Sequence, residues 1–403
     1  MSSLRIVIVA DDMQKEGGNN EIINHMKKAL LDHAATLMML TSTSHSFPST
    51  APSEKDEANC LQVDVEYIIS TQYLPSFIPR KLKDLFRPIY LRNISRETKK
   101  FARASLIITT QPNSHCIKHK NHLIYFQHHL KQYYDLFWES FRQKKGIRKK
   151  IVFLILTAVV RASDTLFLTP NLQKSHVIVN SKTVGQRLEK YNNYSNFHLI
   201  NPGCKLASEI RGEDHLKQIH STRITNDLCP PILLSFSRLS VVQKGIDIIT
   251  QTAQNLPQYT FVIAGPYDPS IDAIKSSSSI TANVKIMIGE FSEEQKAELF
   301  RACDVFLAPY LEEDFGITPL EANGYGKPVI YCEDSGEIVR TQKHKLTGFM
   351  CNRTPTSVAD GIKYCLENKE SMEQACRENG RRYSWDNFEK SIVDYISTNR
   401  VMT

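Results

Sequence analysis

Short apolar runs alternate with polar or helical stretches along this chain, and they do so in two separate series. The first run, Leu4–Ala10, is β-branched and lacks strict alternation of apolar and polar residues, which is typical of a strand buried on both faces of a parallel sheet. The next segment, Glu21–Leu31, places Ile22, Ile23, Met26 and Leu30 on one helical stripe. A repeated strand-and-helix pattern of this kind predicts a doubly wound α/β fold.

The positions of the remaining runs predict two domains. In the first series we expect strands at Leu37–Leu40, Val65–Ile69, Leu106–Thr109, Leu123–Phe126 and His176–Asn180. The pattern restarts after residues 215–231, with strands expected at Ile232–Phe236, Tyr259–Ala264, Val284–Ile288, Val305–Ala308 and Pro328–Tyr331. Since 403 residues exceed one comfortable core, we predict domains at 1–205 and 206–380, and a terminal segment at 381–403. Residues 42–59, rich in Ser, Thr, Pro and charge, are interpreted as a solvated loop.

Charge is distributed unequally between the two halves. Residues 1–205 carry 29 Lys and Arg against 16 Asp and Glu, whereas residues 206–403 carry 21 against 27. The basic half matches no known nucleic-acid reader motif and shows no alternation of aromatic and basic residues, so we do not expect a nucleic-acid partner. A partner such as an anionic membrane or an anionic acceptor would account for this excess of positive charge.

Several features favour a cytoplasmic protein. The start of the sequence lacks the charged, apolar and small-residue regions of a signal peptide. The longest strongly apolar run, Ile151–Val160, is enclosed by cations, and a helix needs roughly 20 residues to cross a bilayer, so we expect no membrane span there. Nine scattered cysteines without a C-x-x-C pair fit a reducing compartment.

Two glutamates, Glu313 and Glu321, bracket the predicted start of a helix that follows the strand Val305–Ala308. Ligands of open α/β sheets bind at the carboxyl ends of strands. Gly316 permits close approach of the backbone, and Pro319 suits a first helical turn, whose N–H groups attract anions. Alone, two such glutamates are more often solvated surface than a binding site.

At this point the sequence resembles the retaining glycosyltransferases of family four, whose second domain carries a Glu, seven residues and another Glu. The resemblance rests on further matches in order along the chain: Ser237-Arg238-Leu239 with Lys244-Gly245, Ile263-Ala-Gly265, Gly289-Glu-Phe-Ser-Glu-Glu294, Gly324–Ile330, Gly336-Glu337 and Thr347-Gly348-Phe349. Weaker matches lie in the first half, at Gly17-Gly18, Tyr125-Phe-Gln-His128-His129, Asn180-Ser181 and Asn201-Pro202-Gly203. The resemblance implies the GT-B architecture, in which two Rossmann-like domains face a central cleft and a terminal helix, here residues 381–403, crosses back to the first domain.

The resemblance also implies a role for each matched residue. Arg238 and Lys244 are expected to stabilise the negative charge that develops on a nucleoside diphosphate leaving group. Glu313 is expected to hold the transferring sugar and Glu321 the ribose hydroxyls. The other predicted site residues are His128, which would contact the donor sugar, and the donor-binding positions Gly17, Gly18, Gly265, Ile288, Phe315, Gly316 and Ile317. A histidine near a strand end is more often simply hydrogen-bonded than catalytic, so a purely structural role stays open for His128 and is favoured for His129.

These roles predict a hexosyltransferase that works with retention of configuration. The segment Glu313–Ile317 and the His128 segment look most like those of mannosyltransferases, so GDP-mannose is preferred to UDP-glucose or another sugar nucleotide as donor. No Asp-x-Asp motif is present, so no obligatory metal cofactor is implied. The expected acceptor is lipid-linked, a glycan or otherwise anionic. Two alternatives stay open: a catalytically silent binding protein of the same fold, and an epimerase that acts on the sugar nucleotide itself.

A second feature is the run Arg142–Lys150, which holds six cations in nine residues beside the apolar run Ile151–Val160. Charge runs are usually solvated, and the apolar run has the pattern of a core helix. Cations beside an apolar helix also describe a peripheral membrane contact. We therefore hypothesise that the basic half docks on an anionic membrane.

Overall fold

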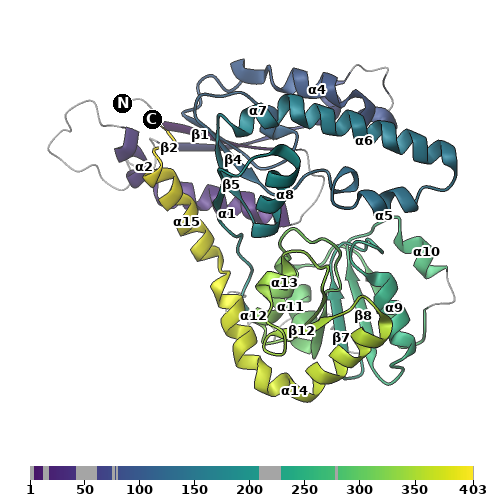
Figure 1. Ribbon diagram of the computed structural model, residues 1–403. Helices are drawn as coiled ribbons and strands as arrows, with labels where there is room; N and C mark the ends of the chain where they lie inside the picture. Colours follow the sequence, from purple (N-terminus) through teal and green to yellow (C-terminus); the bar gives the residue numbers. More distant parts are fainter. Residues whose placement is uncertain are drawn as a thin grey trace. The chain divides into compact units, whose positions relative to one another are not determined.

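The computed structural model of the chain describes residues 4–11, 18–41, 61–74, 78, 80–207, 228–276 and 280–402. The described chain forms two compact units, one of Met1–Asn201 with Phe388–Thr403 and one of Pro202–Asn387. Both are Rossmann-like layers of helices around a sheet (Figure 1). The loop predicted at residues 42–59, Gly17, and most of the segment in which the pattern restarts lie outside the described residues.

The first unit is built on a parallel sheet with the strand order β2-β1-β3-β4-β5-β6. Its strands among the described residues are β1 (Leu4–Asp11), β2 (Leu61–Ile68), β3 (Leu106–Thr109), β4 (His122–Phe126), β5 (His176–Val179) and β6 (His198–Leu199). Most of their apolar side chains are fully buried, which explains the absence of polar and apolar alternation in the sequence.

Helices cover both faces of this sheet (Figure 1). Buried residues of α4, α7 and α8 pack on the face that carries Val7, Ile107 and Ile124. On the other face, α15 places Phe388 against Tyr125 and pairs Glu389 with His25 of α1. The α-helices of the unit are α1 (Gly18–Asp32), α2 (Ala34–Thr41), α4 (Arg87–Ile94), α5 (Phe137–Arg142), α6 (Ile147–Phe167), α7 (Thr169–Leu172), α8 (Lys182–Asn192) and most of α15 (Trp385–Thr398).

The prediction of a strand at Leu37–Leu40 is wrong, because these residues belong to helix α2. Only one turn residue, His33, separates α1 from α2, and helix-type backbone bonds continue through it, from His33 to Ala29 and from Leu37 to His33. Ala, Leu and Met are strong helix formers. The other predicted strands of the first series are confirmed to within a few residues.

The second unit holds another parallel sheet, with the order β12-β11-β10-β7-β8-β9. Its strands are β7 (Ile232–Phe236), β8 (Thr260–Gly265), β9 (Val284–Ile288), β10 (Val305–Leu307), β11 (Val329–Cys332) and β12 (Gly348–Cys351). All five predicted strands are confirmed, and β12 was not predicted. Its helices are α9 (Ile246–Gln254), α10 (Ile271–Lys275), α11 (Glu293–Ala302), α12 (Ile317–Gly324), α13 (Ile338–Thr341) and α14 (Pro355–Arg382).

Helix α6 is longer than the apolar run that the sequence indicated. It has 21 residues, and the stretch Ile147–Leu172 is long and apolar enough to cross a membrane by length and composition alone, with 33% of its most apolar window buried. The run belongs to a helix long enough to span, so its own length does not exclude a span. The expectation of a core helix is wrong, because Ile151, Leu154 and Ile155 are about half exposed.

The buried histidine His122 makes the stability of the first unit depend on pH. Its two ring nitrogens lie 2.9 Å from the hydroxyls of Thr109 and Ser175, and burial lowers its pKa to about 3. Because the pKa of His122 is lower in the folded than in the unfolded state, the neutral ring contributes its full stability above about pH 6.5. That contribution to the free energy of unfolding is lost as the pH falls.

We therefore expect the free energy of unfolding of the parent protein to fall by about 2 kcal/mol, on account of His122, between pH 7.5 and pH 5. The free energy of unfolding of His122→Gln should fall by correspondingly less over that range. Urea unfolding of both proteins at the two pH values, followed by circular dichroism, measures the difference. Groups that do not interact with His122, such as buried His129, cancel in the comparison. An equal loss in the variant would contradict the assignment.

Candidate functional site

The strand order of the second unit reverses between β7 and β10, which are hydrogen-bonded neighbours. The chain leaves β7 toward α9 in one direction and leaves β10 toward α12 in the other, so the two loops that follow these strands separate. Such a switch point opens a crevice at the carboxyl edge of a parallel sheet, where ligands bind. The loops 237–245 and 308–316 contain Arg238, Lys244 and Glu313, so the sheet order brings these predicted residues to one edge.

The loop after β7 carries the two predicted cations. Arg238 is exposed, donates from Nη2 to Oε1 of Gln243 at 3.1 Å, and lies 3.9 Å from Asp268. Lys244 is largely buried. The next residue, Gly245, begins α9 with a φ of 63°, and a β-carbon there would stand 2.3 Å from the carbonyl oxygen of Pro309. Glycine is therefore required where this loop passes close to the loop after β10.

Glu313 and Gly316 lie in the loop after β10. Gly316 is the N-cap residue immediately before α12, with a φ of 87°, and a β-carbon there would stand 2.7 Å from Ile338. Helix α12 has no side-chain cap and no acidic residue in its first turn, whereas α11 is closed by a Ser292 and Gln295 capping box. The positive end of the α12 dipole therefore remains available to an anion.

Lys244 and Glu313 form the central contact of the site. Nζ of Lys244 donates to Oε2 of Glu313 at 2.8 Å, and the two side chains are only 13% and 15% exposed. The same ammonium group lies 4.2 Å from the ring centroid of Tyr310, whose pKa is raised by burial. The side chain of Lys244 is thus held between a carboxylate and an aromatic face, which restricts its rotamers before any ligand arrives.

Glu321 lies within helix α12 and pairs with a residue that the sequence analysis did not identify. Its Oε1 accepts from Nζ of Lys296 on α11 at 2.7 Å, and its side chain is 2% exposed. The site therefore contains two Lys–Glu pairs, one from each end of the Glu313–Glu321 segment. Lys296 could not be identified beforehand because an exposed-looking helical lysine carries no local signal.

The remaining predicted donor-binding residues of the second unit lie near the carboxyl edge of its sheet or beneath that edge. Gly265 ends β8 with a φ of 144°, and a β-carbon there would stand 2.0 Å from the carbonyl oxygen of Ser237. Ile288 ends β9 and is partly exposed. Phe315 is buried against Tyr383 and Leu320, so only its backbone faces the loop, as does that of Ile317 at the first position of α12.

Arg353 is a second residue that sequence reasoning missed. Its guanidinium binds both oxygens of Asp334, each at 2.6 Å, and donates to the carbonyl oxygens of Pro309 and Tyr310 at 2.8 and 2.9 Å. It therefore fixes the start of the loop that carries Glu313. Arg353 follows β12, the strand that the sequence did not reveal, so no local pattern marked it.

In the first unit, His128 and His129 follow β4 and differ in their surroundings. His128 is half-buried, and its Nδ1 lies 2.8 Å from the carbonyl oxygen of His129. His129 is buried among aromatic rings, bonds Asn192 at 2.7 Å, and has its pKa lowered by burial. His128 thus stays a candidate for ligand contact, whereas His129 is part of the core. Gly18 is the first residue of α1.

Polar groups gather where the order of the first sheet reverses, between β1 and β3. Gln127 donates to the side chain of Asn19 at 2.6 Å and to the carbonyl oxygen of Thr110 at 2.9 Å. The amide nitrogen of Asn19 and the hydroxyl of Thr110 are buried and have no hydrogen-bond partner in the part of the chain that the structure describes. Burial raises the pKa of nearby Asp11 to about 6, although backbone donors of Asn113 and Ser114 oppose the shift. Buried unsatisfied polar groups at a switch point suit a hydroxyl-bearing ligand.

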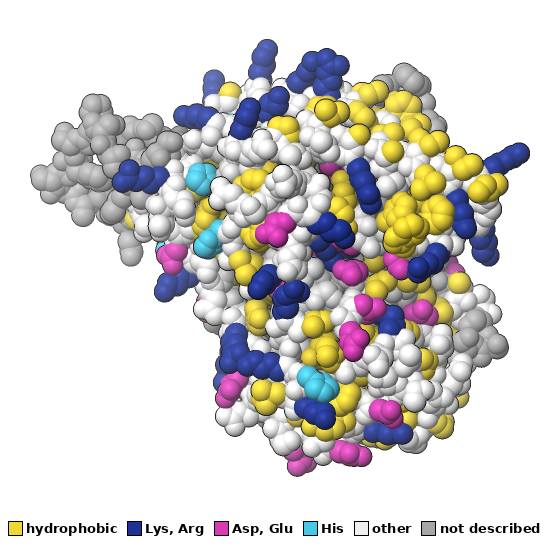
Figure 2. Space-filling view, in the orientation of Figure 1, with side chains coloured by type: hydrophobic (Ala, Val, Ile, Leu, Met, Phe, Trp, Pro, Cys, Tyr) yellow, Lys and Arg dark blue, Asp and Glu magenta, His cyan; other side chains and the backbone are white. Residues whose placement is uncertain are grey.

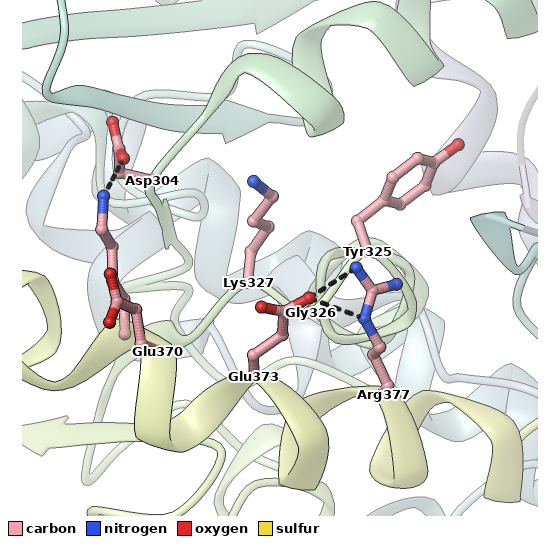
Figure 3. Close-up of a pocket in the computed structure, with 8 residues that line it drawn as sticks. Asp304, Tyr325, Gly326, Lys327, Glu370, Glu373 and Arg377 are labelled. Carbon is pink, nitrogen blue, oxygen red and sulfur yellow. Dashed lines mark hydrogen bonds and ion pairs between the residues drawn. The ribbon is translucent and has the colours of Figure 1, made fainter.

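A charged pocket lies at the opposite edge of the second sheet, near the start of β10 and β11 (Figure 3). Its charges compensate one another. Lys369 pairs with Asp304 at 2.7 Å, and Arg377 pairs with Glu373 at 2.8 Å. Parallel sheets bind ligands at the other edge, so we assign this pocket no ligand. Within the described residues, no group of three His, Cys, Asp or Glu could hold a metal ion.

The comparison that decides the family concerns the unit that holds Lys244 and Glu313. Residues 218–383 match the family model described as Glycosyl transferases group 1. This stretch belongs to the glycosyl transferases group 1 family. The family match thus covers nearly all of the second unit, including both switch-point loops and the Glu313–Glu321 segment.

Named relatives that the chain resembles include sulfoquinovosyl transferase SQD2 of Arabidopsis thaliana, 23% identical over 59% of this chain and 45% of that protein. Alpha-1,3/1,6-mannosyltransferase ALG2 of Homo sapiens is 26% identical over 36% of this chain and 38% of that protein. The chain therefore matches less than half the length of these relatives.

Solved structures resemble the whole chain. Sucrose-phosphate synthase from Thermosynechococcus elongatus has a TM-score of 0.65 at 16% identity, covering 99% of this chain and 100% of that one. HepE from Anabaena, in complex with UDP-glucose, has a TM-score of 0.63 at 15% identity, covering 98% and 99%. These likenesses establish the GT-B fold that the sequence predicted.

The close approach at Gly265 gives a test of how the switch point is packed. We expect Gly265→Ala to destabilise the second unit by at least about 2 kcal/mol, because its β-carbon would meet a carbonyl oxygen in a left-handed conformation. Gly289→Ala is the matched control, since Gly289 follows the next strand and has nothing within 4 Å of a β-carbon. Thermal melting of both variants measures the effect, and equal melting temperatures would refute the packing described.

Proposed function

We propose that the chain is a retaining glycosyltransferase that moves a hexose from a nucleotide sugar to an acceptor. The observation that carries this proposal is the Lys244–Glu313 contact at the switch point of a group 1 unit. Arg238, from the same loop as Lys244, adds a second cation, and the uncapped start of α12 adds a positive dipole. Two cations and a helix N-terminus at the carboxyl edge of a sheet suit a diphosphate.

In the proposed reaction, the bond between the anomeric carbon and the diphosphate oxygen breaks, and the acceptor oxygen bonds to the same face of that carbon. The acceptor proton passes to the departing phosphate oxygen, so no enzyme nucleophile is required. Arg238, Lys244 and the α12 terminus stabilise the charge that develops on the leaving group. Glu313 binds hydroxyls of the sugar, and Glu321 binds those of the ribose. The sequence offers no metal motif, and we propose no obligatory divalent cation.

The Lys244–Glu313 pair has a further consequence for donor binding. A diphosphate competes with Glu313 for the ammonium group of Lys244, and the carboxylate thereby becomes able to accept hydrogen bonds from the sugar. Both side chains are already positioned by Tyr310 and by the loop fixed through Arg353. The reorganisation needed on binding is therefore small.

The identity of the donor is the most specific part of the proposal. The sequence motifs favour GDP-mannose, and the relative ALG2 is named a mannosyltransferase. HepE, in contrast, was solved with UDP-glucose. A hexose is common to both, so we propose a hexosyltransferase with GDP-mannose as preferred donor.

For the acceptor we propose a hydroxyl of a glycan or lipid-linked molecule, bound by the first unit. Buried polar atoms of Asn19 and Thr110 at its switch point lack partners among the described residues, and His128 lies half-exposed beyond the end of β4. The excess of cations in residues 1–205 favours an anionic acceptor, although nucleic acid is not proposed. We place the reaction in the cytoplasm, because no disulfide forms among the cysteines that the structure describes.

Removing either partner of the central contact tests these roles. We expect Lys244→Ala and Glu313→Ala each to lower transfer by at least about 100-fold, because each removes a group that binds the reacting part of the donor. Lys369→Ala is the matched control. It breaks another Lys–carboxylate pair of the same unit, at the opposite edge of the sheet, and should leave transfer within about twofold. Unchanged turnover in the first two variants, with melting temperatures preserved, would refute the assignment.

A thermal-shift screen against GDP, UDP, ADP and their sugars identifies the donor base, since a ligand that binds only the folded protein raises its melting temperature. We expect the largest rise with GDP-mannose. A larger rise with a UDP-sugar would overturn that preference.

Incubation with a nucleotide sugar and no acceptor should leave the donor unrearranged, whereas an epimerised donor would overturn the transfer reaction. Donor binding with no transfer to any glycan or lipid acceptor would instead indicate a binding protein.

A further inference from the structure

The first unit exposes a continuous apolar face along α6. The exposed apolar residues follow one another at helical spacing from Ile147 to Leu166, a length of about 28 Å at the rise of an α-helix. Trp138 on the preceding helix α5 adds an exposed aromatic ring. We name this surface the α5–α6 face; its apolar members are Trp138, Ile147, Ile151, Val152, Leu154, Ile155 and Leu166, each at least 45% exposed.

Cations surround this face, and one of them, Arg142, pairs with Glu139 of α5 at 3.2 Å. Arg142, Lys145, Arg148 and Lys149 are all exposed, and the sequence contains no Asp or Glu between residues 142 and 163. Figure 2 shows hydrophobic side chains gathered over α5 and α6 with Lys and Arg among them. A patch that is both strongly apolar and strongly cationic is unusual on a soluble protein and marks an interaction site.

We propose that the α5–α6 face lies on an anionic membrane, with α6 in the plane of the lipid headgroups. The apolar side chains would enter the acyl boundary while Lys145, Arg148 and Lys149 contact lipid phosphates, as in amphipathic helices that bind membrane surfaces. A second copy of the chain fits less well, because symmetric pairing would bring the cations of both copies together. A neutral apolar partner would leave them uncompensated.

The buried side of α6 requires this orientation rather than a crossing of the bilayer. Phe153 and Val160 pack into the first unit. Asp164 accepts from Arg87 at 2.7 Å and from Tyr134 at 2.8 Å, and the ion pair is almost completely buried. Moving α6 into the hydrocarbon would separate this carboxylate from its guanidinium, which is strongly unfavourable in lipid.

This inference is independent of the donor chemistry, and its test uses the two tryptophans of the chain. Trp138 is 62% exposed, whereas Trp385 is 3% exposed, so changes in fluorescence on vesicle binding report on Trp138. We expect vesicles of phosphatidylcholine with phosphatidylglycerol to sediment the full chain, to shift its emission to shorter wavelength, and to lose binding as salt is raised. Trp138→Phe should abolish the shift but leave most of the binding.

Two pairs of variants separate the charged and apolar contributions. Lys145→Glu with Lys149→Glu, and Ile151→Ser with Ile155→Ser, should each weaken vesicle binding by at least about tenfold. The matched controls lie elsewhere on exposed surface: Lys275→Glu with Lys363→Glu, and Leu31→Ser with Leu346→Ser. These should bind as the parent protein does.

Several outcomes would overturn the inference. Equal binding to vesicles with and without phosphatidylglycerol, or variants of the face that bind as tightly as their controls, would show that the face does not contact lipid. Self-association in sedimentation velocity that the Ile151→Ser and Ile155→Ser variant abolishes would assign the face to a second copy. A nucleotide-induced thermal shift in the same protein tests the proposed function separately, so either proposal can fail alone.

Discussion

The adjacency of β7 and β10 is the constraint on which the proposed chemistry depends. Because the strand order reverses between them, two loops from distant parts of the sequence meet at one edge of the sheet. One loop supplies Lys244 and the other Glu313, and their 2.8 Å contact joins positions 69 residues apart. The sheet thus brings side chains from separate sequence motifs together beside the uncapped start of α12.

The two loops are held by features that bring no ligand group of their own. Gly245, Gly265 and Gly316 occupy conformations and spaces that a β-carbon would not fit. Arg353 ties carbonyl oxygens of the loop after β10 to Asp334. Backbone fixed in this way keeps the charged side chains in place before the donor binds, which reduces the cost of binding.

Much of the fold was predictable because buried parallel strands leave uninterrupted apolar runs, as at Leu106–Thr109 and Ile232–Phe236. Such runs do not distinguish a strand from a short helix, so α2 was taken for a strand. Ordered motifs located Arg238, Lys244, Glu313 and Glu321, and the structure places Lys244 and Glu313 in contact. Lys296 and Arg353 were missed because their partners are brought near only by the fold. The exposed side of α6 was also missed, since periodicity shows that a face is apolar but not what covers it.

The central claim is that a nucleotide sugar binds at the β7 and β10 switch point. Hydrogen–deuterium exchange of the full chain, with and without a saturating nucleotide sugar, tests it most directly, because bound ligand slows exchange of the backbone amides that it orders. The account predicts slower exchange in residues 237–246 and 312–322, with no change around the charged pocket of Asp304 and Arg377. Protection confined to that pocket, or elsewhere in the second unit with both loops unaffected, would contradict it.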